Sequence, residues 1–170
     1  MNLDVRLLRT PIGELYLVAR DDVLVGLEFA DAHDRRGALD RSLTRYLGAC
    51  TTREHADPAG AATRLERYFA GELAALEEQP VEPHGTRFQL DVWRALRTIP
   101  AGTTLSYGGL AERIGRPAAV RAVGAANGAN PVALFVPCHR VIAADRTLWG
   151  YGGGLERKRG LPVTVCALLV

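Results

Sequence analysis

The chain has 170 residues and a mass of 18.4 kDa, long enough for one domain or two small ones around a sizeable hydrophobic core. Hydrophobic residues make up 48% and charged residues 24%, a composition that excludes disordered, fibrous and collagen-like chains. No apolar run approaches the roughly 20 residues of a membrane span, and the first residues do not have the pattern of a signal peptide.

The three cysteines are Cys50, Cys138 and Cys166. Their number is odd and none lies in a C-x-x-C pair, so a disulfide framework is not expected. A structural zinc site would need more cysteine and histidine residues at closer spacing. We therefore expect a protein of a reducing, cytoplasmic compartment that holds no metal ion.

The first part of the chain predicts a small sheet followed by helices. Strand-like runs cover residues 5–9, 15–19 and 23–29, and their short connections favour an antiparallel meander. A weak helical stretch follows at 39–47. Residues 61–76 predict an amphipathic helix, because their apolar side chains recur at helical intervals.

The charge of the chain changes sign near Pro83. Residues 1–83 contain 10 Arg and 15 Asp or Glu, a net charge of −5, whereas the rest contains 11 Arg or Lys and 4 Asp or Glu, a net charge of +7. Residues 77–85 include two prolines and a glycine, which is typical of a linker. We predict two domains, at 1–80 and 84–170, and the basic second domain favours a polyanionic partner.

Three helices are predicted in the second half, over residues 86–99, 106–115 and 118–127, with Thr86 and Ser106 as N-caps. The second and third are separated by a glycine-containing turn and form a candidate helix-turn-helix. Small side chains on the third helix would allow its backbone to approach a DNA groove closely. An ordinary helical hairpin is the alternative that the pattern leaves open.

A short apolar strand is predicted at residues 132–136, followed by Pro137-Cys138-His139-Arg140 and a further apolar run at 141–144. A cysteine becomes a nucleophile when a neighbouring base or positive charge favours its thiolate. Adjacent residues on a strand point to opposite faces, so His139 reaches the sulfur of Cys138 only if the backbone turns there. Cys138 is thus a candidate nucleophile, and inert packing is the alternative.

Several short stretches of the second half occur together in one order and spacing: Phe88-Gln89-x-x-Val92-Trp93, Ile99-Pro100-x-Gly102, Ser106-Tyr107-Gly108, Arg121-Ala122-Val123-Gly124, Ala126-Asn127, Asn130-Pro131, Pro137-Cys138-His139-Arg140-Val141-Ile142 and Gly150-Tyr151-x-Gly153-Gly154-Leu155. The first domain adds Pro11-Ile12-Gly13 and Tyr68-Phe69-x-Gly71. On these residues the chain resembles the O6-alkylguanine-DNA alkyltransferase family, also called methylated-DNA–protein-cysteine methyltransferases, over about residues 88–159.

The resemblance implies an α+β fold: a small N-terminal antiparallel-sheet domain, ribonuclease H-like, and a C-terminal helical, winged helix-turn-helix DNA-binding domain. It implies single-turnover DNA repair without a cofactor, in which Cys138 takes the alkyl group from the O6 atom of guanine as a stable thioether. Repair of O4-alkylthymine is left open. The implied catalytic roles are deprotonation of Cys138 by His139 through a water, donation to the departing guanine by Tyr107, and bracing of the turn by Asn130.

The partner implied by the resemblance is double-stranded DNA that contains an alkylated guanine, bound in the minor groove with the target base flipped out. Arg121 would enter the base stack in place of that base. The other expected DNA contacts are Arg116, Ala122, Gly124 and Arg140. The guanine pocket is expected around Val141, Tyr151, Gly152 and Gly153. We expect a monomer in solution and leave cooperative binding on DNA open.

The last eleven residues depart from the family pattern. The family has a glutamate that orients the catalytic histidine, and Val165 stands at the spacing where that residue is expected. Pro162 would also disrupt a helix that starts near Leu155. Without an acceptor for its second ring nitrogen, His139 would be a weaker base, so we expect slower alkyl transfer than in a relative with the glutamate, or a less stable protein.

Three other functions remain to be weighed against repair. A sensor that binds alkylated DNA without repairing it would lack the nucleophile, whereas Cys138 is present. A regulator that uses the methylated protein as a signal would have an additional zinc-binding, cysteine-rich domain. A cysteine hydrolase would turn over repeatedly instead of being consumed.

Overall fold

The computed structural model describes residues 1–145 and Glu156. The chain divides into two compact units. The first comprises Met1–Gly85 together with Pro131–Phe135, and the second comprises Thr86–Asn130 together with the chain from Val136 onward. Five residues from the second half of the sequence therefore fold with the first unit.

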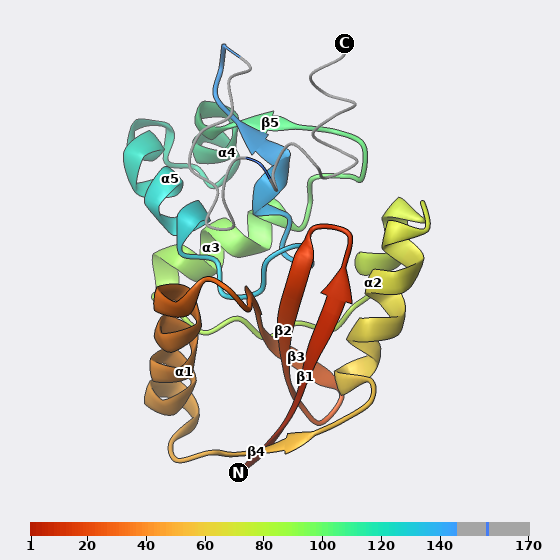
Figure 1. Ribbon diagram of the computed structural model, residues 1–170. Helices are drawn as coiled ribbons and strands as arrows, with labels where there is room; N and C mark the ends of the chain where they lie inside the picture. The colour runs from red at the N-terminus through yellow and green to blue at the C-terminus, as the bar shows by residue number, and fades with distance from the viewer. Residues whose placement is uncertain (146–155, 157–170) are drawn as a thin grey trace. The chain divides into compact units, whose positions relative to one another are not determined.

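A four-stranded sheet forms the centre of the first unit (Figure 1). Its strands are β1 (Asn2–Thr10), β2 (Gly13–Arg20), β3 (Val23–Phe29) and β4 (Thr51–Glu54), in the order β3-β2-β1-β4. The first three are antiparallel, as the short connections predicted. The fourth pairs parallel to β1, so the sheet is mixed and has one strand more than the predicted three-stranded meander. Its four residues are all exposed and polar, and so they lack the alternation that would have predicted a strand.

Helices cover both faces of this sheet. Figure 1 shows α1 (His33–Leu47) and α2 (Ala61–Phe69) on opposite sides of the strands. Accordingly β2 is buried on both faces, over five consecutive residues. On the α1 side, a Cβ atom added to Gly26 of β3 would lie 2.8 Å from Leu39, so the helix packs directly against the strand backbone. The cluster on this side contains Leu3, Val5, Tyr16, Val18, Val25, Leu39 and Leu43.

The helix predicted over residues 61–76 is two elements. The α-helix α2 ends at Phe69, and a separate 3-10 turn, η2, spans Leu73–Leu76. Gly71 has a φ of +108°, and the amide of Glu72 donates to the carbonyl of Arg67 across it. This is the arrangement with which a left-handed glycine commonly ends a helix.

Three α-helices lie between Thr86 and Asn130 in the second unit. Helix α3 (Arg87–Leu96) begins with a capping box, in which Thr86 accepts from the Gln89 amide and the Gln89 side chain accepts from the Thr86 amide. Helix α4 (Tyr107–Arg113) is capped by Ser106. After the turn at Gly115, which has a φ of +71°, the 3-10 turn η3 (Pro117–Ala119) leads into α5 (Val120–Gly128).

The strand expected at residues 132–136 is not formed. Leu134 has a φ of +69°, a left-handed conformation that a strand does not accommodate. Val132 makes an isolated bridge to Leu27 of β3, supported by a hydrogen bond from the Leu27 amide to the Pro131 carbonyl. A continuous apolar run could not distinguish an extended strand from this buried, irregular segment.

Some expectations lie outside the described residues. These are the loop at 149–154 with Tyr151, Gly152 and Gly153, most of the helix expected to begin at Leu155, and the tail with Pro162 and Val165. Within residues 1–145 and at Glu156, no helix is long and apolar enough to cross a membrane.

Candidate active site

Cys138 begins the 3-10 turn η4, which spans Cys138–Arg140. The Cys138 amide donates to the Val136 carbonyl at 2.8 Å, and the Arg140 amide donates to the Pro137 carbonyl at 3.0 Å. A 3-10 turn has about three residues per turn, so consecutive side chains are not directed to opposite faces as on a strand. The backbone therefore turns at the point where a functional Cys–His pair requires it. Cys138 is 5% exposed and His139 is fully buried.

Tyr107 is brought to this turn by a short parallel ladder. Strand β5 (Leu105–Ser106) pairs with β6 (Val141–Ile142), with Leu105 opposite Val141. Tyr107 follows β5 directly, and η4 precedes β6 directly. The ladder thus joins two motifs that are more than thirty residues apart in the chain.

The environment of the Tyr107 phenol raises its pKa above the usual value near 10. Burial of the half-buried ring is the main cause, the negative charge of a Cys138 thiolate raises the pKa further, and a hydrogen bond with the Asn127 side chain opposes both. Tyr107 is therefore protonated at neutral pH and lies close enough to Cys138 for their charges to interact. A group in this state can act as a proton donor.

Two buried asparagines hold the backbone around the cysteine. Asn130 is 1% exposed, and its Nδ2 donates to the Val136 carbonyl at 2.7 Å. Asn127, on α5, is also 1% exposed, and its Nδ2 donates to the Cys138 carbonyl at 3.3 Å. Asn130 therefore holds the segment just before the turn, and Asn127 holds the turn itself.

Arg140 is buried and hydrogen-bonded to the backbone. Its residue is 2% exposed, and its Nη1 donates to the Ile99 carbonyl at 2.6 Å. A guanidinium that is enclosed by protein is not available to a DNA phosphate, so this burial argues against the direct DNA contact expected of Arg140. Its hydrogen bond instead ties η4 to the end of the α3 segment, which is a structural role.

The exposed residues of α5 are Val120, several residues with small side chains, and one cation. Arg121 and Ala122 are exposed, Gly124 is half-buried, and Val123 and Ala126 face the core. Arg116 is exposed just before η3, with its guanidinium 5.5 Å from the centre of the Phe88 ring. A helix with this surface can approach a nucleic-acid backbone closely and present one long cationic side chain to it.

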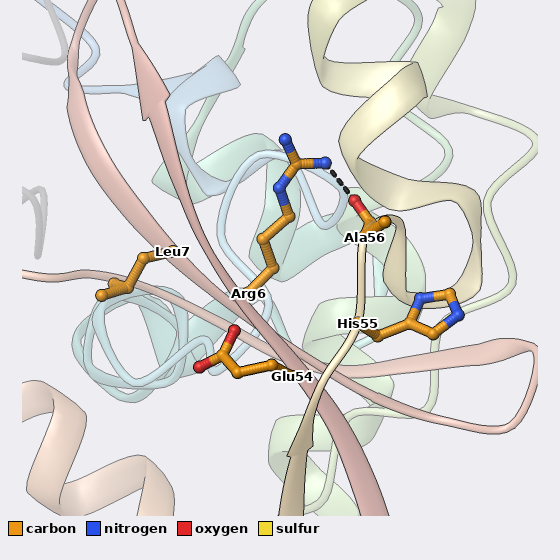
Figure 2. Close-up of a pocket in the computed structure, with 5 residues that line it drawn as sticks. All are labelled: Arg6, Leu7, Glu54, His55 and Ala56. Atoms are coloured by element: carbon orange, nitrogen blue, oxygen red, sulfur yellow. Dashed lines mark hydrogen bonds between the residues drawn. The ribbon is translucent and has the colours of Figure 1, made fainter.

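A separate depression lies on the first unit, next to β1 and β4. Figure 2 shows its lining residues, with the Arg6 guanidinium directed at the Ala56 carbonyl, to which it donates a hydrogen bond. Glu54 and His55 are exposed there, and the residues that line the depression include no cysteine. None of the residues expected to act in catalysis belongs to it. Among the described residues, no three His, Cys, Asp or Glu side chains form a group that could hold a metal ion.

Comparison with known proteins covers nearly the whole chain. Residues 5–83 match the model of the 6-O-methylguanine DNA methyltransferase ribonuclease-like domain, and residues 87–162 match that of the DNA-binding domain of the same proteins. A methylated-DNA–protein-cysteine methyltransferase from Mycolicibacterium paratuberculosis is 47% identical over 159 residues, which is 94% of this chain and 90% of that protein. One from Salmonella typhimurium is 44% identical over 153 residues, or 89% of each chain.

The chain belongs to the methylated-DNA–protein-cysteine methyltransferase family.

Solved structures of the family agree with this assignment. The crystal structure of Mycobacterium tuberculosis O6-methylguanine methyltransferase has a TM-score of 0.74 and 42% identity, and covers 97% of this chain and 93% of its own. The crystal structure of Mycobacterium tuberculosis OGT in complex with DNA has a TM-score of 0.75 and 40% identity, and covers 99% of both chains. The two-domain α+β architecture, ribonuclease-like and DNA-binding, is that of the family. As a methyltransferase of this family, the protein binds DNA and repairs it by alkyl transfer to a cysteine of its own.

Of the residues expected in this methyltransferase site, the structure brings Tyr107, Cys138, His139, Asn130 and Val141 into one unit, and Val141 is fully buried. Sequence reasoning assigned no role to Asn127, although it noted the Ala126-Asn127 dipeptide. A signal was available, because Asn127 is spaced four residues after Val123 on the inner face of a predicted helix, where an apolar side chain is the norm.

Proposed function

We propose that Cys138 is the acceptor of the alkyl group and that the substrate is an O6-alkylguanine in double-stranded DNA. The single observation that supports this best is the interaction between Tyr107 and Cys138, which puts a proton donor beside the only cysteine with a histidine at the next position. The family assignment supplies the reaction class, and the geometry of this unit favours these residues for it.

The proposed step is a direct displacement. His139 takes the thiol proton of Cys138 through a water, and the sulfur attacks the alkyl carbon. A bond forms between sulfur and carbon, the bond between carbon and O6 breaks, and its electron pair stays with the guanine. Tyr107 donates a proton to the departing guanine, which would otherwise leave as an anion.

The product explains why the protein would act once. A thioether has no carbonyl carbon for water to attack, so the alkyl group stays on the sulfur. Each molecule then repairs one base, and the amount of protein limits the amount of repair. A free thiol with this task must stay reduced, which supports our proposal of a reducing, cytoplasmic compartment.

The target atom lies inside the base stack, so the guanine must be flipped out of the duplex. We assign the wedge that replaces it to Arg121, the exposed cation of α5, which is followed directly by the small side chain of Ala122. Ala122 and Gly124 would permit close approach in the minor groove, and Arg116 would contact a phosphate. We propose that the protein does this as a monomer.

The deciding experiment is mass spectrometry after incubation with a duplex that contains one O6-methylguanine. We expect a gain of one methyl group on the peptide that contains Cys138, in stoichiometric yield, and no gain for Cys138→Ser. Binding of the duplex without any methyl gain would support a sensor of alkylated DNA instead. Repeated turnover by one protein molecule would support a hydrolase.

A further inference from the structure

Asn127 is a polar residue where the fold calls for an apolar one. It lies on α5 beside Ala126, in the part of the helix that faces the core, and it is 1% exposed. Leucine has the same branching pattern and would bury apolar surface at this position. Burying an amide instead costs free energy unless its donors and acceptors are satisfied.

The amide is only partly satisfied by the protein. Its Nδ2 donates to the Cys138 carbonyl at 3.3 Å, a long hydrogen bond. Its Oδ1 is buried and has no hydrogen-bond partner among the residues that the structure describes. A residue that served packing alone would not retain a buried acceptor in this state.

The second contact of Asn127 is with Tyr107. The side-chain amide lies within hydrogen-bonding reach of the phenol, and the Tyr107 ring packs against α5, where a Cβ atom on Gly124 would lie 3.9 Å from two of the ring carbons. An amide nitrogen has two hydrogens, so one Nδ2 can serve both the Cys138 carbonyl and the phenol oxygen. One buried side chain is therefore bonded to the backbone of the proposed nucleophile and to the proposed proton donor.

We propose that Asn127 is a positioning residue for the alkyl transfer, which joins the Cys138 backbone to the Tyr107 phenol and supports the phenol as it gives up its proton. This inference rests on the function proposed above for Cys138 and Tyr107. Asn127 does not touch the alkyl group, and it acts through Tyr107.

The charge changes during the step explain why the amide matters. As the carbon–O6 bond breaks, the Tyr107 proton moves to the guanine and negative charge develops on the phenol oxygen. The N–H of Asn127 donates to that oxygen and stabilises the charged form, which makes the phenol a stronger acid. An apolar residue at position 127 would leave the developing phenolate facing a buried, unpolarised surface.

A double-mutant cycle tests this. Single-turnover rates on an O6-methylguanine duplex at saturating protein are measured for the wild type, Asn127→Leu, Tyr107→Phe and the double variant. Trp93→Phe is the matched control, because it removes a buried hydrogen bond of 2.8 Å to the carbonyl of Ala126, one residue from Asn127 on the same helix. Asn127→Ala repeats the test with a smaller, strongly helix-forming residue in case Asn127→Leu does not fold.

We expect Asn127→Leu or Asn127→Ala to slow transfer about tenfold in the presence of Tyr107, which corresponds to about 1.4 kcal/mol. In the Tyr107→Phe background the same substitution should change the rate by less than about twofold, since the group through which Asn127 acts is gone. Trp93→Phe should leave the rate within about twofold of the wild type. This should hold even if it lowers the melting temperature as much as the Asn127 substitutions do.

A second substrate separates positioning from damage to the nucleophile. Iodoacetamide alkylates a thiolate and needs no proton donor, so its rate of reaction with Cys138 should be the same in the wild type and the Asn127 variants. If the Asn127 variants react more slowly with iodoacetamide and with DNA by the same factor, the substitution acts on Cys138. If they slow alkyl transfer by the same factor with Tyr107 present and in Tyr107→Phe, the effect is structural. Either result would overturn the proposal.

The proposed function of Cys138 and the proposed role of Asn127 can be refuted separately. If the wild-type protein places no methyl group on Cys138, the proposed function is wrong. If the methyl group appears on Cys138 and Asn127→Leu transfers it at the wild-type rate, the proposed function stands and the role of Asn127 is wrong.

Discussion

Leu105 pairs with Val141 in the two-stranded parallel sheet of the second unit. Tyr107 follows one partner by two residues, and Cys138 precedes the other by three. This register brings the phenol near the thiol, and the electrostatic interaction between Tyr107 and Cys138 is its consequence. The ladder thereby sets the geometry on which the proposed proton transfer depends.

The first prediction concerns Tyr107 itself. Tyr107→Phe should slow alkyl transfer about 10²–10⁴-fold, the usual contribution of a general acid. The measurement is the single-turnover rate on an O6-methylguanine duplex, with DNA affinity measured separately. A fall in rate that is fully explained by weaker DNA binding would contradict the assigned role.

The pH dependence follows from the direction of the Tyr107 pKa. Burial first, and the charge of Cys138 second, raise this pKa above its usual value near 10. The donor is therefore protonated throughout the neutral range, and the wild-type rate should show no decline between pH 7 and 9 that is due to Tyr107. The pH–rate profile checks this, and a decline between pH 7 and 9 that disappears in Tyr107→Phe would contradict it.

The contact between the Tyr107 ring and α5 gives a steric prediction. A Cβ atom at Gly124 lies at ordinary contact distance from the ring, whereas no residue that the structure describes lies within 4 Å of one at Gly128. Gly124→Leu should displace the ring and slow transfer at least about tenfold at saturating DNA, and Gly128→Leu should leave the rate unchanged. Both replace a helix glycine and gain about 0.5–1 kcal/mol of helix propensity, so propensity cannot account for a difference between them. Equal rates for the two variants would show that the ring can move without effect.

Because Arg140 is buried, replacing it should lower the stability of the protein and leave the salt dependence of DNA binding unchanged. Arg140→Met removes a charge-assisted hydrogen bond to the Ile99 carbonyl and should lower the free energy of unfolding by about 2–3 kcal/mol. Urea unfolding measures this, with Arg113→Met as the control, because Arg113 is exposed and bonded to a side-chain hydroxyl. The salt slope is the slope of the logarithm of the DNA-binding constant against the logarithm of the salt concentration. If Arg140→Met reduced the magnitude of this slope by about one, Arg140 would contact a phosphate, as the sequence predicted.

The proposed wedge can be tested by comparing substrates. Arg121→Ala should slow transfer from duplex DNA at least about tenfold and have a much smaller effect on a short single strand, where no base pair has to be opened. Arg116→Ala should weaken binding to both and reduce the salt slope by about one, as expected for a phosphate contact. If Arg121→Ala slowed both substrates equally, its role would be binding and not base flipping.

Local patterns in the sequence determined much of the architecture. The capping interactions of Thr86 and Ser106 and the short turns between the first three strands involve residues close in the chain, and each appears where it was predicted. The contiguous Pro137-Cys138-His139-Arg140 motif likewise identified the family, because its specificity lies in neighbouring residues.

Only the tertiary structure decided the features that depend on distant residues. β4 forms because β1 offers it a free edge. Residues 131–135 do not form a regular strand, because Val132 is bridged to Leu27 and Leu134 has a left-handed conformation. Arg140 is buried because the Ile99 carbonyl, 41 residues away, accepts its hydrogen bond. Asn127 emerged for the same reason: periodicity places it on the inner face of a helix, but only the folded unit shows that its amide meets both Cys138 and Tyr107.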